Sequence, residues 1–124
     1  MGKAAPDDTL DALLDKIATA TRLSVCTDEP ANFAGIAALQ LASVTLTAGD
    51  GNGDYTVANG DTNGRKVTVA QQASIAITAS GDADHIVLDD GTTLIYVTTC
   101  TLQTLTNGGT VTVPAWDAEV ADPT

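Results

Sequence analysis

The single histidine of the chain is the best candidate for a catalytic residue. His85 stands on an alternating stretch of residues with several carboxylates close to it in sequence. An Asp–His pair can act as a general base for a hydroxyl nucleophile, and the nearest hydroxyls belong to Ser80 and Thr92. Ser and Thr occur throughout the chain, however, and no nucleophile-elbow or oxyanion-hole glycine pattern accompanies them. We therefore expect His85 to pack and hydrogen-bond within a sheet, and we predict no catalytic residues and no enzymatic activity.

The longest polar loop spaces its carboxylates as a calcium-binding loop does. Asp50, Asn52 and Asp54 stand at alternate positions, and Asp61 occupies the place of the last ligand. Tyr55 stands where the tight turn needs Gly, the last ligand is Asp instead of the bidentate Glu, and no helices flank the loop. The glycines are followed by no Lys-Ser/Thr pair, so this is not a phosphate loop either. We expect a solvated loop, with no metal and no cofactor.

The chain has two cysteines, Cys26 and Cys100, each in a strand-like run. Two cysteines and one distant histidine do not have the spacing of a metal site. We expect two buried thiols that pack as small apolar side chains. A disulfide between them requires neighbouring strands, which the sequence leaves open.

The charge balance is strongly acidic. Sixteen acidic residues against five basic ones give a formal charge of −11. This charge repels phosphate backbones and anionic membrane surfaces, so we expect neither nucleic acid nor membrane as a partner. The acidic residues serve solubility, or form the outer surface of an assembly or a surface complementary to a basic partner. Arg65 and Lys66 form the one basic cluster, which either salt-bridges the acidic surface or contacts a neighbouring subunit.

The N-terminal residues contain no apolar stretch of the kind found in a secretory signal. Gly2 is a poor myristoylation site, because Pro6 stands where that motif needs Ser or Thr. These features predict synthesis and folding in the host cytoplasm.

One amphipathic helix is predicted over residues 8–20, after a flexible arm over residues 1–6. Leu10, Leu13, Leu14 and Ile17 follow helical spacing and form one apolar stripe, and Asp7 and Asp8 offer an N-cap. A helix this short is marginal alone, so its stripe must dock on a sheet or on another subunit.

The remainder of the chain is predicted to form strands. In the second half, short Val, Ile, Leu and Thr runs predict strands over 65–70, 74–79, 84–89, 93–99 and 110–113. Glycine-bearing turns separate several of them, at 80–82, 90–91 and 107–109. In the first half we expect strands at 23–26, 39–48 and 55–57, with a β-bulge between Leu41 and Val44. Residues 31–38 fit a loop or one helical turn.

These elements predict an all-β fold in one domain. The expected architecture is an antiparallel β-sandwich of roughly seven to nine strands, with the short N-terminal helix packed against it. The β-domain spans 22–120 and a tail occupies 121–124. Trp116, Ala118 and Val120 alternate as a final edge strand, whose apolar side faces the protein's own sheet or braces an adjoining subunit.

The order of these segments resembles the small structural proteins of tailed bacteriophages, which are encoded among head and tail genes. The resemblance covers nearly the whole chain, and its most distinctive part is His-Ile-Val-Leu-Asp-Asp-Gly at 85–91. The other matching segments lie at 10–17, 25–30, 60–69, 94–100 and 107–116. The resemblance implies a virion protein, either a decoration or cement protein on the capsid surface or a tail or tail-fibre component. It carries over no catalytic residues.

The resemblance further implies that the protein works by binding to the major capsid protein or to other virion proteins. If the resemblance does not hold, two alternative functions are left for this chain, a non-viral β-sandwich binding module and a hydrolase. Avidity favours self-association, with trimers on local threefold positions as the preferred state. The residues predicted to form protein interfaces are Leu10, Leu13, Leu14, Ile17, Arg65, Lys66 and Trp116.

Overall fold

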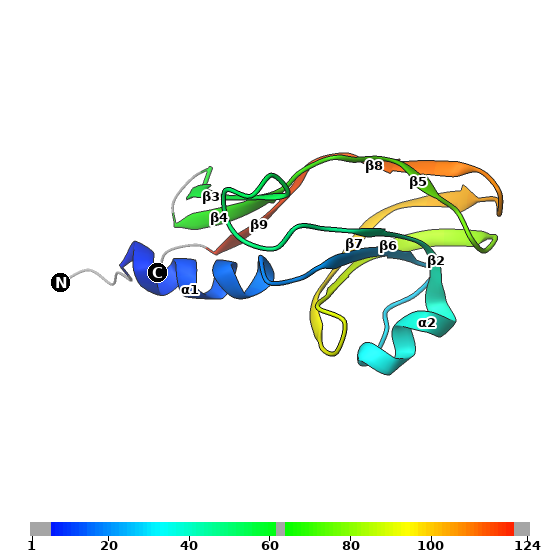
Figure 1. Ribbon diagram of the computed structural model, residues 1–124, viewed down its shortest axis with the longest axis horizontal. Coiled ribbons are helices and arrows are strands. Elements are labelled where there is room, and N and C mark those ends of the chain that lie inside the picture. The colour runs from blue at the N-terminus through cyan, green and yellow to red at the C-terminus, as the bar shows by residue number, and fades with distance from the viewer. Residues whose placement is uncertain (1–5, 62–63, 121–124) are drawn as a thin grey trace. The chain divides into compact units, whose positions relative to one another are not determined.

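The protein is mostly β-structure, with 52% strand and 14% helix. The computed structural model describes residues 6–61 and 64–120, so most of the predicted arm and the whole predicted 121–124 tail lie outside the described residues. The described chain forms nine strands in three antiparallel sheets and two short α-helices, and it contains no barrel (Figure 1). The prediction of a β-rich, antiparallel fold is confirmed.

The chain contacts divide the protein into two compact units, each assembled from segments far apart in sequence. Unit 1 contains residues 1–19, 47–71 and 114–124. Unit 2 contains residues 20–46 and 72–113.

Unit 1 is a three-stranded antiparallel sheet with a helix packed against it. The strands lie in the order β3 (Tyr55–Asn59), β4 (Arg65–Val69), β9 (Trp116–Val120), and helix α1 (Asp7–Ile17) contacts β4 and β3. The apolar residues buried in this unit are Leu10, Leu14, Ile17, Ala18, Tyr55, Val67, Val69 and Ala118. The alternation along β4 thus places Val67 and Val69 toward the core, and Lys66 and Thr68 on the opposite face.

Helix α1 is shorter than predicted and starts without a side-chain cap. Pro6 is its N-cap residue, and the Pro6 carbonyl accepts hydrogen bonds from the amides of Thr9 and Leu10 at 3.0 and 3.2 Å. The helix ends at Ile17, three residues before the predicted end. The Thr19 hydroxyl donates to the Lys16 carbonyl at 2.6 Å, which satisfies a C-terminal carbonyl from outside the helix.

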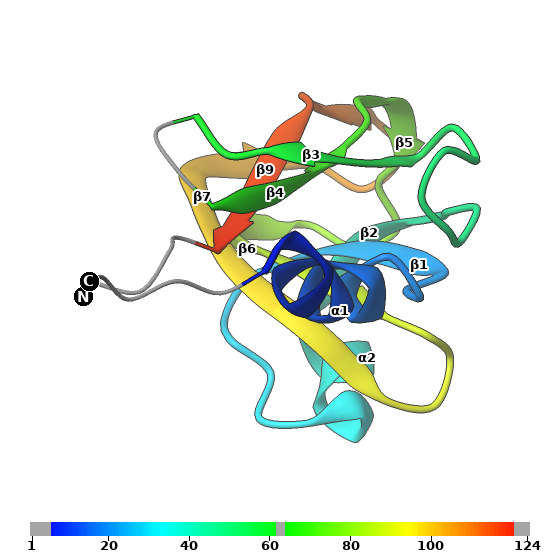
Figure 2. The same ribbon diagram turned by 90° about the vertical axis from the view of Figure 1, so that its left-hand side faces the viewer.

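Unit 2 contains a four-stranded antiparallel sheet and a two-stranded ribbon. The sheet has the order β2 (Gln40–Thr45), β1 (Arg22–Cys26), β6 (Gly81–Asp89), β7 (Leu94–Leu105). The ribbon pairs β5 (Gln72–Ala76) with β8 (Thr110–Val113). Figures 1 and 2 show the ribbon on one side of the sheet and α2 (Ile36–Leu39) on the other.

The α2 side of the sheet holds a small apolar cluster. Cys26, Ile36 and Val87 are buried there, and Phe33, Leu39, Leu94 and Val97 pack against them. The 3₁₀ turn η1 (Phe33–Gly35) leads directly into α2, so the residues predicted as a loop or one helical turn form a 3₁₀ turn and a single α-helical turn.

Two register irregularities shape β7, the longest strand. Ile95 is an extra residue opposite the step from Leu88 to Asp89 on β6. Further along, Cys100, Thr101 and Leu102 together face the single residue Asp84. The second bulge leaves Leu102 with 61% of its surface exposed, because a bulge turns side chains out of the regular alternation.

Candidate interaction surfaces

The apolar stripe of α1 is divided between the core and the surface. Leu10, Leu14 and Ile17 are buried in unit 1, with Leu14 at 0% exposure, so these three side chains pack inside the chain itself. Leu13 is 53% exposed. The prediction that the stripe docks on a sheet is therefore confirmed for three residues, and Leu13 alone retains apolar surface for a partner.

The basic cluster is neutralised by carboxylates of its own unit. The Arg65 guanidinium donates to Asp11 at 2.7 and 3.2 Å and to the Asn59 side-chain oxygen at 2.8 Å. Helix α1 and the sheet thus share a bidentate ion pair, which fixes the helix on the sheet.

Lys66 makes the second part of this cluster. Its ammonium group lies 2.7 Å from Asp61 and 3.4 Å from Asp117, and the hydrogen bond that it donates to Asp61 is the main reason that the pKa of Lys66 is raised. Of the two roles predicted for Arg65 and Lys66, the structure contains the first, salt-bridging of the acidic surface. The contact with a neighbouring subunit stays a prediction.

Trp116 begins the edge strand β9 and is half-buried opposite Val69. Ala118 is buried and Val120 is half-buried, while Asp117 and Glu119 are exposed. The predicted final edge strand is therefore present, with its apolar side toward the core of unit 1.

His85 is hydrogen-bonded to its sequence neighbour rather than to a nucleophile. Its Nδ1 lies 2.6 Å from the Asp84 carboxylate, and its cross-strand neighbours are Cys26 on β1 and Thr99 on β7. The two hydroxyls considered as nucleophiles form hydrogen bonds within turns instead. Ser80 Oγ accepts from the Asn107 amide at 2.9 Å, and the Thr92 hydroxyl donates to Asp90 at 3.0 Å.

Both cysteines are free thiols, because β6 lies between their strands. This settles the pairing that the sequence left open. Cys26 is fully buried, and burial raises the pKa of its thiol from an ordinary 9.0 to about 11. Burial also raises the pKa of Cys100, which keeps part of its surface exposed. A raised pKa lowers the thiolate fraction, so neither thiol is an activated nucleophile.

This shift predicts a fall in stability at alkaline pH. A group whose pKa is raised on folding stabilises the protein fully below its unfolded pKa, and this contribution is lost as pH rises through the folded value. We expect the midpoint of thermal unfolding to fall between pH 9 and pH 11, the interval that the Cys26 shift defines. Calorimetry should show a shallower fall for Cys26→Ala, whereas the control Cys100→Ala should keep most of it. Equal slopes in the two variants would contradict the assignment to Cys26.

The carboxylates of the glycine-rich loop brace the loop itself. Asp50 accepts the Val57 amide at 2.9 Å, and Asp54 accepts the Thr47 amide at 2.6 Å. Asp61 pairs with Lys66 instead of turning toward the other two carboxylates. Within residues 6–61 and 64–120, no group of three or more His, Cys, Asp or Glu side chains is placed to hold a metal ion.

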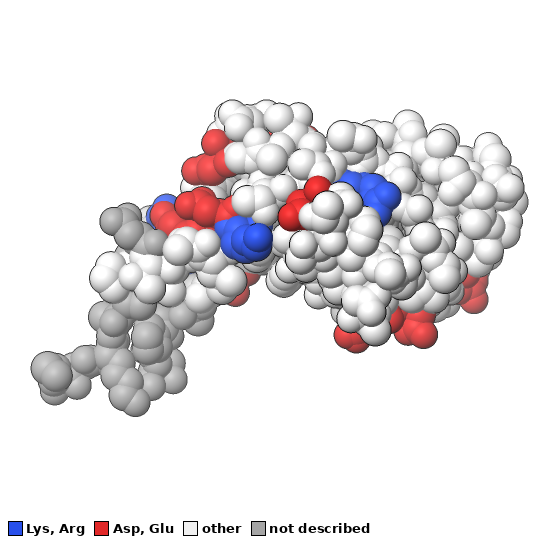
Figure 3. Space-filling model, turned by 60° about the horizontal axis from the view of Figure 1, so that its bottom comes forward, with Lys and Arg blue, Asp and Glu red and all other residues white. Residues whose placement is uncertain are grey.

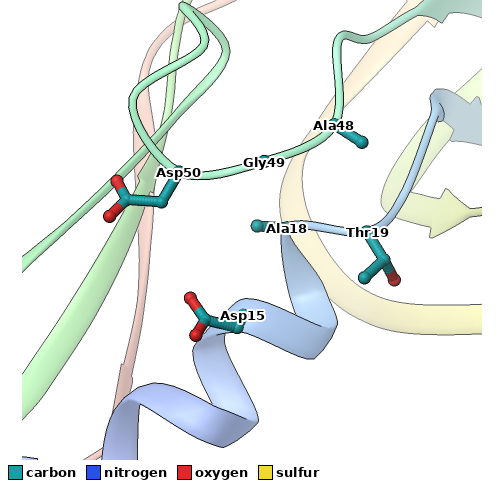
Figure 4. Close-up of a pocket in the computed structure, with 6 residues that line it drawn as sticks. All are labelled: Asp15, Ala18, Thr19, Ala48, Gly49 and Asp50. Atoms are coloured by element: carbon teal, nitrogen blue, oxygen red, sulfur yellow. The ribbon is translucent and has the colours of Figure 1, made fainter. Parts of the chain in front are cut away.

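An open cavity of about 320 Å³ lies in unit 1 where α1 ends (Figure 4). It is lined by Asp15, Ala18, Thr19, Ala48, Gly49 and Asp50. The Gly49 amide donates to the Ala18 carbonyl at 2.9 Å and ties the loop to the helix end. The two carboxylates make the cavity acidic, and the hydroxyl of Thr19 is already bonded to Lys16.

Figure 3 shows a face on which acidic and basic side chains are scattered among uncharged residues, without a continuous basic patch. Among the described residues, no helix combines the length and the apolar character needed to cross a membrane.

No protein-family model matches the chain, and comparisons with curated proteins and with solved structures give no match either.

Proposed function

We propose that this protein is a structural component of a bacteriophage virion that binds and stabilises the capsid surface as a decoration or cement protein. The observation that carries the proposal is the order of segments, which resembles small structural proteins of tailed phages over nearly the whole chain. A small β-rich fold supports it, because β-domains of this size commonly serve as building blocks and binding surfaces.

The chemistry of the described side chains agrees with a binding role. The polar groups singled out as potential catalysts bond to one another or to turns, as His85 does with Asp84 and Ser80 does with Asn107. We therefore propose a protein without enzymatic activity, whose partners are the major capsid protein or other virion proteins.

The proposed architecture is a β-sandwich. The four-stranded sheet of unit 2 and the β5–β8 ribbon would form its two layers, because the ribbon lies on the side of the sheet opposite α2 (Figure 1). A bridge between Ala42 and Ile77 links the ribbon strand to the edge of the sheet.

The test is the composition of particles released by cells that express the gene from its native locus. Quantitative mass spectrometry of gradient-purified particles should find the protein at a fixed ratio to the major capsid protein, and immunogold labelling should place it on heads. Labelling on tails at low copy number would favour the tail or tail-fibre alternative instead. Absence from washed particles would overturn the virion assignment and leave a non-viral binding module.

Among the predicted interface residues, Leu13 keeps the most apolar surface, with 53% of it exposed. We expect Leu13→Asp to reduce particle occupancy about tenfold, as loss of an interface anchor does. Thr9→Asp is the matched control, because Thr9 is an exposed residue of the same helix and the change adds the same charge. Circular dichroism should show equal melting temperatures for both variants. Equal occupancy by both would remove Leu13 from the interface.

A further inference from the structure

We propose that Asn52 is a site of spontaneous deamidation, which converts its side chain into aspartate or isoaspartate and releases the 49–53 loop from the Ala48 carbonyl. The inference concerns the isolated chain and does not depend on the proposed role in a virion.

The sequence is rich in the dipeptide that deamidates most readily. Four of its five asparagines are followed by glycine, at 52–53, 59–60, 63–64 and 107–108. Glycine has no Cβ, so its amide nitrogen can approach the side chain of the preceding residue without a clash. Three of these pairs are described completely, since Asn63 lies outside the described residues. The sequence alone does not say which pair reacts first.

Deamidation begins at the backbone amide of the glycine. The Gly53 nitrogen loses its proton to hydroxide and attacks Cγ of Asn52, the Cγ–Nδ2 bond breaks, and the side-chain nitrogen leaves as ammonia with a proton from water. Water then opens the resulting succinimide ring at either of its carbonyl carbons, which gives aspartate or isoaspartate. The net reaction consumes water and releases ammonia, with no oxidation or reduction. A glycine amide that is held in a hydrogen bond must leave that bond before it can attack.

The Gly53 amide is not held in this way. The Gly60 amide donates to the Gly64 carbonyl at 2.9 Å, and the Gly108 amide donates to the Ile77 carbonyl at 3.0 Å. Among residues 6–61 and 64–120, no group accepts a hydrogen bond from the Gly53 amide. All three asparagines are exposed, so the hydrogen bond of the following amide, and not access to water, separates the three pairs.

The two Asp-Gly pairs, at 50–51 and 90–91, can form the same ring and are protected in the same way. The Gly51 amide donates to the Tyr55 carbonyl at 2.9 Å. The Gly91 amide donates to the Asp89 carboxylate, also at 2.9 Å. Among the pairs that the structure describes, the reaction is therefore expected first at Asn52.

The Asn52 side chain holds the loop in place. Its Nδ2 donates to the Ala48 carbonyl at 2.9 Å, and it packs so closely on Gly49 that a Cβ there would clash with it. A carboxylate in this position has no hydrogen to donate and places negative charge against the carbonyl oxygen. Gly49 also donates its amide to the Ala18 carbonyl where α1 ends (Figure 4). Loss of the Asn52 bond therefore loosens the loop at the point where it meets the helix.

Peptide mapping by mass spectrometry tests the site. The full chain is aged at mildly alkaline pH in heavy-oxygen water, both folded and unfolded in urea, so that each succinimide that opens gains a labelled oxygen. In the folded chain we expect deamidation at Asn52 to be at least about fivefold faster than at Asn59 or Asn107, because an ordinary hydrogen bond must open at the other two. In urea the three rates should converge.

Three results would overturn this assignment. They are equal rates at the three sites in the folded chain, no reaction at Asn52 there, and the same order of rates in urea. The last result would assign the preference to local sequence instead of to the hydrogen bonds of the fold.

Asn52→Asp tests the consequence for the loop. Asn107→Asp is the matched control, because Asn107 is exposed, its side chain bonds to none of the described residues, and the change adds the same charge. Hydrogen exchange at the Gly49 amide should be about fivefold faster in Asn52→Asp and unchanged in Asn107→Asp. Circular dichroism should show that both variants fold. Equal exchange rates in the two variants would show that Asn52 does not brace the loop.

Discussion

Replacement of Arg22 by methionine should lower the free energy of unfolding by about 3 kcal/mol, because a buried carboxylate loses its ion-pair partner. Asp89 is fully buried, and its carboxylate lies 2.8 Å from the Arg22 guanidinium. The other Asp89 oxygen accepts the Gly91 amide at 2.9 Å, a bond that survives the substitution. Arg22 is partly exposed and also stacks over the Phe33 ring at 5.9 Å, so methionine retains some of its apolar contact.

Urea denaturation monitored by circular dichroism measures this loss. Lys66→Met is the matched control, because it also removes one cation from carboxylate partners, but Asp61 and Asp117 are 69% and 35% exposed, whereas Asp89 is fully buried. We expect that control to cost less than about 1 kcal/mol, as surface ion pairs do. If the two variants lost equal stability, the buried Asp89 would not be the source of the effect.

Leu14→Ala should destabilise the protein by about 3 kcal/mol, since it removes apolar contacts and leaves a cavity. Leu14 has no exposed surface, and it lies on the side of α1 that packs on the sheet of unit 1. Its neighbour Leu13 provides an unusually close control. Leu13 is 53% exposed, so Leu13→Ala should change stability by less than about 0.5 kcal/mol.

Thermal and urea unfolding of the two single variants test this difference directly. A loss from Leu13→Ala as large as that from Leu14→Ala would show that both side chains are covered in solution. The result would then indicate a partner or a second copy over α1 under the conditions of measurement.

Glycines predicted the turns between strands correctly where the backbone has a positive φ. They predicted a turn wrongly where the glycine has another role. Gly91 and Gly108 have φ values of +93° and +94°, and each stands between two strands as predicted. The turn predicted around Gly81 is wrong, because Gly81 is the first residue of β6. A Cβ at Gly81 would lie 3.2 Å from the Leu41 side chain, so this glycine permits close packing instead of a turn. Sequence spacing does not separate these two uses.

The length of β7 was underestimated for a related reason. The strand was predicted to end at Thr99, where the apolar pattern changes, but it continues to Leu105. The three-residue bulge at Cys100–Leu102 shifts the pattern and lets pairing with β6 resume at Gln103. A change of phase in the sequence therefore marked a bulge here. In β2 a bulge was predicted between Leu41 and Val44, but residues 42–44 pair regularly with β1 and the bulge comes earlier. There the step from Val25 to Cys26 on β1 leaves Leu41 as the extra residue.

The candidate interface was harder to predict than the fold. Helical spacing gave the stripe on α1 correctly, but it cannot say which of two adjacent leucines faces the sheet. That depends on where the helix lies across β4 and β3, which only the tertiary structure defines. Likewise, the partners of Arg65 and Lys66 come from α1 and β9, which are more than fifty residues away for Asp11 and Asp117.

The division of unit 1 among three segments has a consequence for the order in which the chain is made. Its sheet is completed by β9, which pairs with β4 and is synthesised after every segment of unit 2. The segments of unit 2, in contrast, are all synthesised once Val113 has been added. During translation, α1, β3 and β4 are therefore present for some time before the final strand of their sheet is made. Their Val67 and Val69 side chains stay available to chaperones, or to other nascent chains, until β9 has been synthesised.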